Sequence, residues 1–146
     1  MDIISEAVHN RCITAPALAW LIAQLIKAAT DLAIQRKINV RRLLGSGGMP
    51  SSHTAYVTTL AIAVAKAEVI KSPLFAVCLA FAMVVMHDAA GVRRAAGKQA
   101  KLLNALMTTH FPGEAFNERL KELIGHKPLE VLVGAIFGVL MGVAFG

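Results

Sequence analysis

The stretch from residue 47 to residue 54 combines a glycine turn, two serines and a histidine at the start of an apolar run. The glycines let the backbone turn freely, and Pro50 suits the first position of a helix. Ser51 and Ser52 would then offer amides and hydroxyls at the positive end of that helix, a setting that attracts phosphate. His53 adds a titratable proton donor beside such an anion. An ordinary helix start with a polar cap is the alternative.

A second pair of polar residues, His126 and Glu130, lies where the last apolar run begins. On a helix, their spacing of four places the carboxylate one turn from the imidazole, so the two can interact. The alternative is a helix-starting pair in which the carboxylate caps backbone amides.

Cations accompany both stretches. Lys27 lies inside the first apolar run, four residues before Asp31. A lysine inside a spanning helix normally faces the bundle interior or a wet cavity, although it can also pair with a carboxylate or extend to the interface. Asp88 lies near the end of the third apolar run, and Arg93 and Arg94 follow that run. The arginines could clamp a phosphate or form an exposed collar at the membrane end.

The composition indicates a single membrane domain, residues 1–146. The chain is 56% hydrophobic and only 16% charged, with a mean hydropathy of +0.61, which is too apolar for a small soluble domain. The net charge of +6 could suggest nucleic acid, but a single Trp and a single Tyr give no stacking platform, so we expect no nucleic-acid partner. Cys12 and Cys78 form no CxxC pair, and we expect neither a metal nor another cofactor.

Four apolar runs approach or reach the length needed to cross a bilayer. They cover residues 14–34, 54–70, 73–90 and 128–146. The cationic, alanine-rich stretch after residue 90 is expected to continue the third helix out of the membrane. Residues 114–124 carry apolar side chains at helical spacing and predict an amphipathic helix at the interface. The predicted fold class is all-α: a polytopic membrane helical bundle of about four transmembrane helices plus an amphipathic interfacial helix.

Most cations lie in the link between the first and second runs and in the link between the third and fourth runs. These cations are Arg36, Lys37, Arg41, Arg42, Arg93, Arg94, Lys98, Lys101, Arg119, Lys121 and Lys127. The positive-inside tendency places both links in the cytoplasm and both termini outside. The polar stretches described above then meet at the cytoplasmic face of a membrane, which we expect to be the inner membrane of a bacterium.

Glycines recur every four residues in the last run, at Gly134, Gly138, Gly142 and Gly146. Such a stripe lets two membrane helices bring their backbones into contact. We expect that it would suit a homo-oligomer.

Three blocks of the chain resemble the divergent PAP2 family, which is related to acid phosphatases and vanadium-dependent haloperoxidases. They are GGMPSSHTA at residues 47–55, DAAGVRRAAGKQA at residues 88–100 with the following Leu-Asn, and GHKPLEV at residues 125–131 with its glycine-rich tail. The blocks occur in order over nearly the whole chain. Ser52 stands where ordinary PAP2 phosphatases carry a glycine, and Arg119 lies seven residues before His126, one more than their motif has.

The resemblance implies phosphoryl transfer through a histidine, without a metal. In that scheme His126 attacks the phosphorus, Glu130 holds its imidazole in the nucleophilic tautomer, and His53 protonates the departing alcohol. The block that begins at Asp88 is expected to complete the catalytic site. The expected phosphate-binding residues are Lys27, Arg41, Arg42, Ser51, Ser52, Arg93 and Arg94.

The expected place of these groups at a membrane face predicts the substrate class. A phosphatase of this kind would act on a phosphate monoester carried by a membrane lipid, such as phosphatidylglycerol phosphate or phosphatidic acid. The alternative is a non-catalytic membrane protein whose basic face binds anionic lipid or a partner. Haloperoxidase action with bound vanadate fits less well, because a lipid surface is poorly placed for it.

Overall fold

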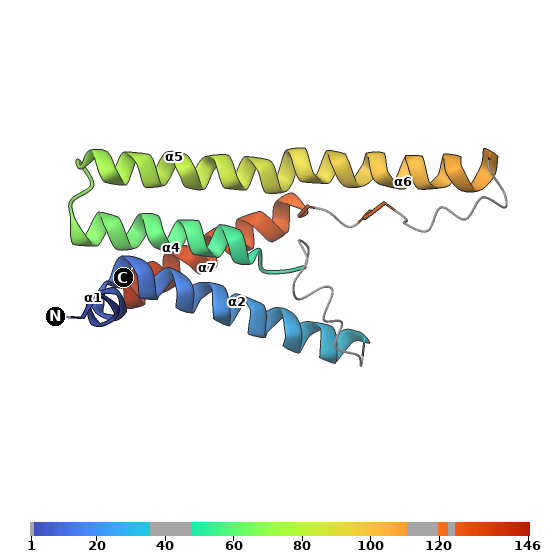
Figure 1. Cartoon of the computed structure of the whole chain (residues 1–146). Coiled ribbons are helices and arrows are strands. Elements are labelled where there is room, and N and C mark those ends of the chain that lie inside the picture. Colours follow the sequence, from blue (N-terminus) through green and yellow to red (C-terminus); the bar gives the residue numbers. More distant parts are fainter. Residues whose placement is uncertain (1, 36–47, 111–119, 123–124) are drawn as a thin grey trace.

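The computed structural model describes residues 2–35, 48–110, 120–122 and 125–146, and the regular elements among them are helical. A short helix α1 (Ile3–His9) leads into α2 (Arg11–Gln35), and α4 (Ser52–Ala67) is followed by α5 (Pro73–His87). A short π-helical segment, η1 (Asp88–Val92), joins α5 to α6 (Arg93–His110) and is called the π-turn below. The last helix is α7 (Pro128–Phe145) (Figure 1). The predicted all-α fold class is confirmed.

Three helical stretches are long and apolar enough to cross a membrane, namely Arg11–Thr30, Pro73–Thr109 and Pro128–Phe145. The second predicted span corresponds to α4, which has 16 residues and packs against α2, α5 and α7 as the central helix. Large apolar side chains stand exposed on the outer helices, as a lipid-facing surface requires. Examples are Leu25 on α2, Val77 and Phe81 on α5, and Leu132 and Leu140 on α7.

Small and hydroxyl-bearing side chains allow α4 to occupy the centre of the bundle. Its buried residues include Ser52, Thr54, Ala55, Thr59, Ala61 and Ala63. The Thr59 hydroxyl donates a hydrogen bond to the carbonyl oxygen of Gly138 at 3.0 Å, so the backbones of α4 and α7 lie close together. This close packing compensates for the scarcity of large side chains in the core.

The glycine stripe of α7 packs against α4 of the same chain. A Cβ added at Gly134 would lie 2.6 Å from the carbonyl oxygen of Ser51, and one added at Gly142 would lie 2.5 Å from Cβ of Ile62. Since α4 occupies this face, a homo-oligomer would have to use another surface. Oligomerisation itself stays a prediction.

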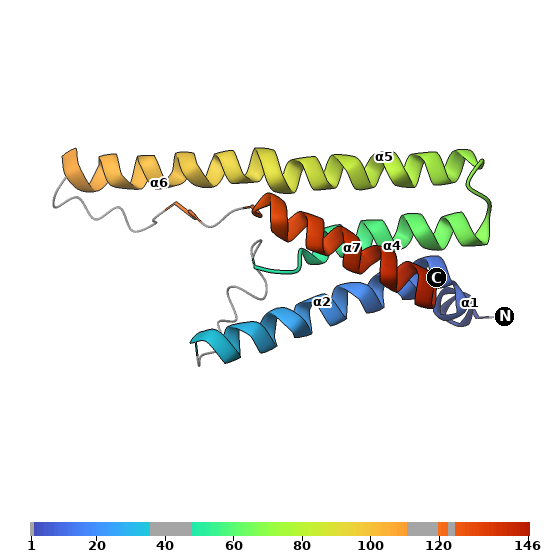
Figure 2. The same cartoon turned by 180° about the vertical axis from the view of Figure 1, so that it is seen from behind.

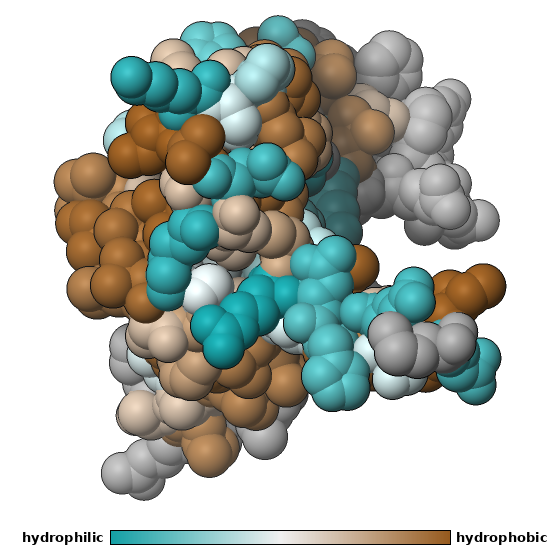
Figure 3. All heavy atoms as spheres, turned by 90° about the vertical axis from the view of Figure 1, so that its left-hand side faces the viewer, coloured by the Kyte–Doolittle hydropathy of each residue, from teal (hydrophilic) through white to brown (hydrophobic). Residues whose placement is uncertain are grey.

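The two ends of the bundle differ in what they present. Both termini lie at one end, together with the turn between α4 and α5 (Figures 1 and 2). Figure 3 looks onto that end and shows polar side chains gathered there, with hydrophobic surface on the flanks. The N-termini of α4 and α7 point toward the opposite end, so the polar stretches predicted to form a site face the same way.

Helices α5 and α6 form one continuous rod through the π-turn (Figure 1). At a rise of about 1.5 Å per residue, the rod from Pro73 to His110 is about 55 Å long, nearly twice the ~30 Å hydrocarbon thickness of a bilayer. The predicted continuation of the third helix beyond residue 90 is confirmed. Arg93, at the junction, therefore lies near the middle of the rod.

The start of α4 differs from the prediction. Ser51 has extended backbone angles and its Oγ accepts a hydrogen bond from the backbone N–H of Thr54, so it caps a helix that begins at Ser52. Pro50 therefore precedes the cap and is not the first helical residue. Gly48 makes the expected turn with a positive φ of 84°.

The predicted amphipathic helix over residues 114–124 is not helical at the residues described, 120–122. The Asn104 side chain on α6 binds both backbone groups of Leu120: Nδ2 donates to the carbonyl oxygen at 2.9 Å, and Oδ1 accepts from the N–H at 3.0 Å. These bonds take the place of bonds within a helix. Residues 114–119 and 123–124 lie outside the described residues.

Replacing Gly138 with alanine is expected to destabilise the bundle. The new Cβ would lie 2.7 Å from the carbonyl oxygen of Ala55 and 2.8 Å from Cβ of Thr58, so α4 and α7 would have to separate. We expect a loss of about 1–3 kcal/mol, measured as a lower midpoint of thermal unfolding in detergent. The matched control is Gly91→Ala, whose Cβ would meet His87 only at 3.8 Å. Equal losses in both variants would contradict this packing.

Candidate functional site

The N-terminus of α4 meets the N-terminus of α7. The backbone N–H of Ser51 donates to the carbonyl oxygen of Glu130 at 3.1 Å, and the missing side chain of Gly134 leaves room for Ser51. Helix N-termini carry partial positive charge and unpaired amides. Two such ends side by side form an electropositive setting that suits an anion.

His126 lies at this junction, immediately before α7. Its Nδ1 lies 3.0 Å from Oε2 of Glu130, and the same oxygen accepts the backbone N–H of Lys127 at 3.2 Å. Both interpretations of this pair therefore hold, because the carboxylate caps the helix and also binds the imidazole. A carboxylate at Nδ1 favours a proton there and leaves the lone pair on Nε2.

The imidazole of His126 is buried, with only 2% of the residue exposed. Its Nε2 atom has no hydrogen-bond partner among the described residues. Buried polar atoms are normally paired, so an unpaired nitrogen at this position is unusual. This atom is the group best placed to meet a ligand in the site.

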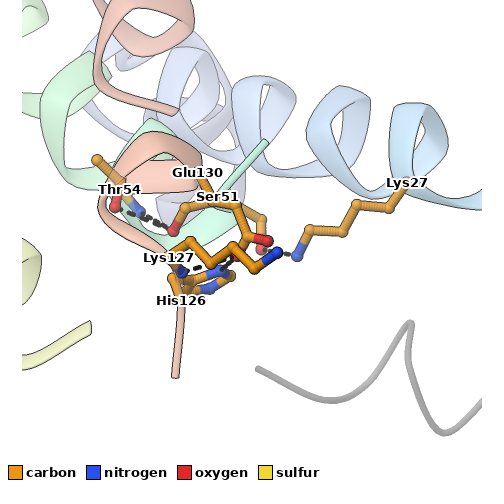
Figure 4. A network of polar contacts seen from close by, with 7 residues as sticks. Lys27, Ser51, Thr54, His126, Lys127 and Glu130 are labelled. Atoms are coloured by element: carbon orange, nitrogen blue, oxygen red, sulfur yellow. Dashed lines mark hydrogen bonds and ion pairs between the residues drawn. The ribbon is translucent and has the colours of Figure 1, made fainter. Parts of the chain in front are cut away.

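Lys27 reaches the same site from α2. It is only 4% exposed, and its Nζ donates to Oγ of Ser52 at 3.2 Å. Figure 4 shows the side chain extending from α2 toward the residues around His126 and Ser51. Lys27 therefore faces the bundle interior, which is one of the two positions predicted for it.

The π-turn brings a second cation to the site. Asp88 and Arg93 form an ion pair across the turn, with Nε and Oδ2 2.6 Å apart. The Arg93 charge acts on the imidazoles of both His53 and His126. Within this arrangement Asp88 is the partner of Arg93, and its catalytic role stays a prediction.

His53 stands in the first turn of α4, where it is exposed. The charges of Arg93 and Lys27 act on it, and so does the imidazole of His126. The two histidines, 73 positions apart in the sequence, therefore lie within electrostatic reach of one another. Their roles in catalysis remain predictions, but they share one site.

The structure brings together most of the residues predicted from the sequence. The convergent set is Lys27, Ser51, Ser52, His53, Asp88, Arg93, His126 and Glu130. The side chain of Arg94 is exposed, while its backbone packs against Gly125. Arg41, Arg42 and Arg119 lie outside the described residues.

Sequence reasoning missed the backbone groups that hold His126. Its N–H donates to the carbonyl oxygen of Ala89, in the π-turn, at 2.9 Å. Gly125 has a positive φ of 105°, and a Cβ there would lie 2.5 Å from the backbone nitrogen of Arg94. The glycine directly before His126 was the available signal, but no pattern in the sequence reveals a π-turn.

Burial lowers the pKa of His126 below its ordinary value. The hydrogen bond and charge of Glu130 oppose this shift, whereas the charges of Lys27 and Arg93 add to it. The ring is therefore neutral near pH 7, as a nucleophile must be. As the pH falls through about 6.5, the unfolded chain takes up a proton that the folded protein does not, so acid reduces the stability contributed here.

Comparisons with known proteins identify relatives over almost the full length. The model of the family described as "Divergent PAP2 family" matches residues 8–141. The chain is 39% identical to the uncharacterized membrane protein YuiD of Bacillus subtilis (strain 168) over 148 aligned positions, which cover 93% of this chain and 94% of YuiD. No solved structure matches the chain.

Replacing Glu130 with glutamine is expected to lower the pKa of His126 further. The substitution keeps an oxygen that can accept from Nδ1 but removes the negative charge that favours the imidazolium form. An NMR titration of the histidine ring carbons in the purified protein measures the shift. Glu68→Gln, at the far end of α4, is the control and should leave this pKa unchanged. A rise in the Glu130 variant would refute the assigned contact.

Proposed function

This chain belongs to the divergent PAP2 family, and we propose that it is a membrane-embedded phosphatase that removes a phosphate monoester from a lipid. One observation carries the proposal: the buried Nε2 of His126 has no hydrogen-bond partner in the part of the chain that the structure describes, while Nδ1 is held by Glu130. A neutral imidazole oriented in this way has the form required of a nucleophile.

In the proposed reaction, Nε2 of His126 attacks the phosphorus and forms a phosphohistidine. The bond between phosphorus and the lipid oxygen breaks, and the departing alkoxide takes a proton from His53. Water then attacks the phosphohistidine and gives a proton back to His53. Inorganic phosphate leaves, and Nε2 regains its lone pair.

Positive groups around His126 support this chemistry. A transferred phosphoryl group spreads negative charge over its three peripheral oxygens, and preorganised cations and amides stabilise that charge. Lys27 and Arg93 supply the cations, and the start of α4 supplies backbone amides and the Ser52 hydroxyl. Because Lys27 is buried, its charge is weakly screened by water.

The place of the site in the bundle supports a lipid substrate. The site lies beside the junction of α5 and α6, near the end of a stretch of α5 whose outward side chains are apolar. A phosphate attached to a lipid would reach this level while its acyl chains remain beside the helices. Phosphatidylglycerol phosphate and phosphatidic acid are the monoesters we propose, with the site at the cytoplasmic face.

Phosphate release by the purified protein in detergent tests the assignment of roles. Across a panel of lipid phosphates, His126→Ala should abolish release, and His53→Ala should lower it by about 10²–10⁴-fold. An analogue with an aryl leaving group needs little protonation, so it should restore much of the activity of the His53 variant and none of that of the His126 variant. His9→Ala, an exposed histidine on α1, is the control.

The same assay can reject the proposal. Activity that survives both substitutions would rule out these histidines as the catalytic pair. No release from any lipid phosphate would favour the alternative function, a membrane protein that binds anionic lipid through its basic face. Inhibition by vanadate, which mimics the five-coordinate transition state, is expected in the wild-type protein.

Labelling of single cysteines tests the orientation. In a background with Cys12 and Cys78 replaced by alanine, Lys71→Cys should react with a membrane-impermeant maleimide in intact cells, and Lys121→Cys should not. Both side chains are exposed, and they lie on opposite links of the bundle. The reverse labelling pattern would place the site outside and exclude a cytoplasmic lipid substrate.

A further inference from the structure

The segment that leads to His126 is attached to α6 at several levels. Farthest from the bundle, Asn104 binds the backbone of Leu120 through both of its amide atoms and donates to Oε1 of Glu122 at 2.8 Å. Closer to the bundle, Gly125 packs directly on the backbone of Arg93 and Arg94. The described residues of this segment therefore lie against α6, and Gly125 lies nearer than Leu120 to the membrane-spanning part of the rod.

The face of α6 that receives this segment carries small side chains. Gly97 and Ala100 are buried, although α6 extends beyond the bundle. Arg94, Lys98 and Lys101 lie on the adjacent face and are exposed. Small residues on one side of a helix allow a backbone to approach closely. Gly97 and Ala100 lie between the contacts at Arg94 and at Asn104, so a backbone can approach this face of α6 closely.

The two contacts lie close together in the sequence. Leu120 binds Asn104, and His126, six residues after Leu120, binds Ala89, which lies 15 residues before Asn104 on the rod. A connection of only six residues limits how far His126 and the residues bound to Asn104 can move apart.

His126 is held between α7 and the rod. The imidazole is bound to Glu130 in the first turn of α7, and its backbone N–H is bound to Ala89 in the π-turn. The position of the ring between α7 and the rod depends on the chain that precedes it. Asn104 fixes that chain through three hydrogen bonds.

We propose that Asn104 is a positioning residue for the nucleophile: by anchoring Leu120 and Glu122 to α6, it holds His126 in its buried place between the rod and α7. This inference rests on the proposed function of His126, but its structural part stands on the contacts of Asn104. Asn104 touches neither the imidazole nor the site, and it acts through the chain alone.

Asn104→Ala should lower kcat by about 10- to 100-fold while KM changes less than about threefold, because a misplaced nucleophile weakens the transition state more than substrate binding. Thr108→Ala is the matched control, since its hydroxyl, one turn farther along, bonds carbonyls of α6 itself and no other group among the described residues. Unchanged kcat in the Asn104 variant would overturn the proposal.

A charge swap separates positioning from a general loss of structure. Asn104→Asp keeps the acceptor for Leu120 but places a carboxylate against that of Glu122, so kcat should fall. Adding Glu122→Gln restores a donor opposite the new carboxylate and should recover part of the loss, although the bond to the carbonyl oxygen of Leu120 stays lost. If Asn104→Ala does not accumulate in the membrane, this pair decides the question. Failure of the second substitution to recover activity would contradict the anchor.

An NMR titration of the His126 ring tests the proposal independently of phosphatase activity. In Asn104→Ala, the loosened ring should gain contact with water, and its pKa should rise toward the ordinary value of about 6.5. An unchanged pKa would refute the positioning role even if the protein proves to be a phosphatase. A shifted pKa in a protein that releases no phosphate would uphold the anchor and reject only the proposed function.

Discussion

The close approach of α4 and α7 at their N-termini is the contact on which the site depends. It exists because Gly134 has no side chain, so the backbone of Ser51 can lie against α7 and bind the carbonyl oxygen of Glu130. That contact places His126, which lies two residues before the start of α7, beside the first turn of α4. It also brings two positive helix ends together, which is unfavourable unless negative charge lies nearby. The carboxylate of Glu130, which accepts the backbone N–H of Lys127, supplies such a charge.

Burial of Lys27 and His126 carries a cost, which at Nε2 of His126 no bond from the described residues offsets. Moving ionisable groups out of water is unfavourable unless they gain partners. Lys27 gains Ser52, and Nδ1 of His126 gains Glu130, but Nε2 gains nothing from the described residues. An unpaired buried atom reduces stability, and losses of stability of this kind are commonly found at functional sites. A phosphoryl group at Nε2 would supply the missing partner.

The long rod of α5 and α6 ties the membrane-spanning part to the segment beyond it. Its π-turn sits beside the site, where such turns are frequent, and gives one carbonyl, that of Ala89, to the backbone of His126. The ion pair of Asp88 and Arg93 spans the same turn. The irregular backbone of the rod and the site residues therefore lie in one place. A change in the shape of the rod at the π-turn would move the imidazole of His126.

The sequence by itself determined the apolar helices and the residues whose side chains can take part in a reaction. Apolar runs bounded by Pro73 and Pro128 define helices by local rules, and the spacing of His126 and Glu130 is a property of one helical turn. Which residues share a site was decided only by tertiary structure. The glycines of α7 could have packed on a second copy or on any helix, and their contact with α4 depends on three-dimensional fit. Likewise, Leu120 bonds to Asn104, 16 residues earlier, and the described residues 120–122 are not helical, since long-range hydrogen bonds can override a local periodic pattern.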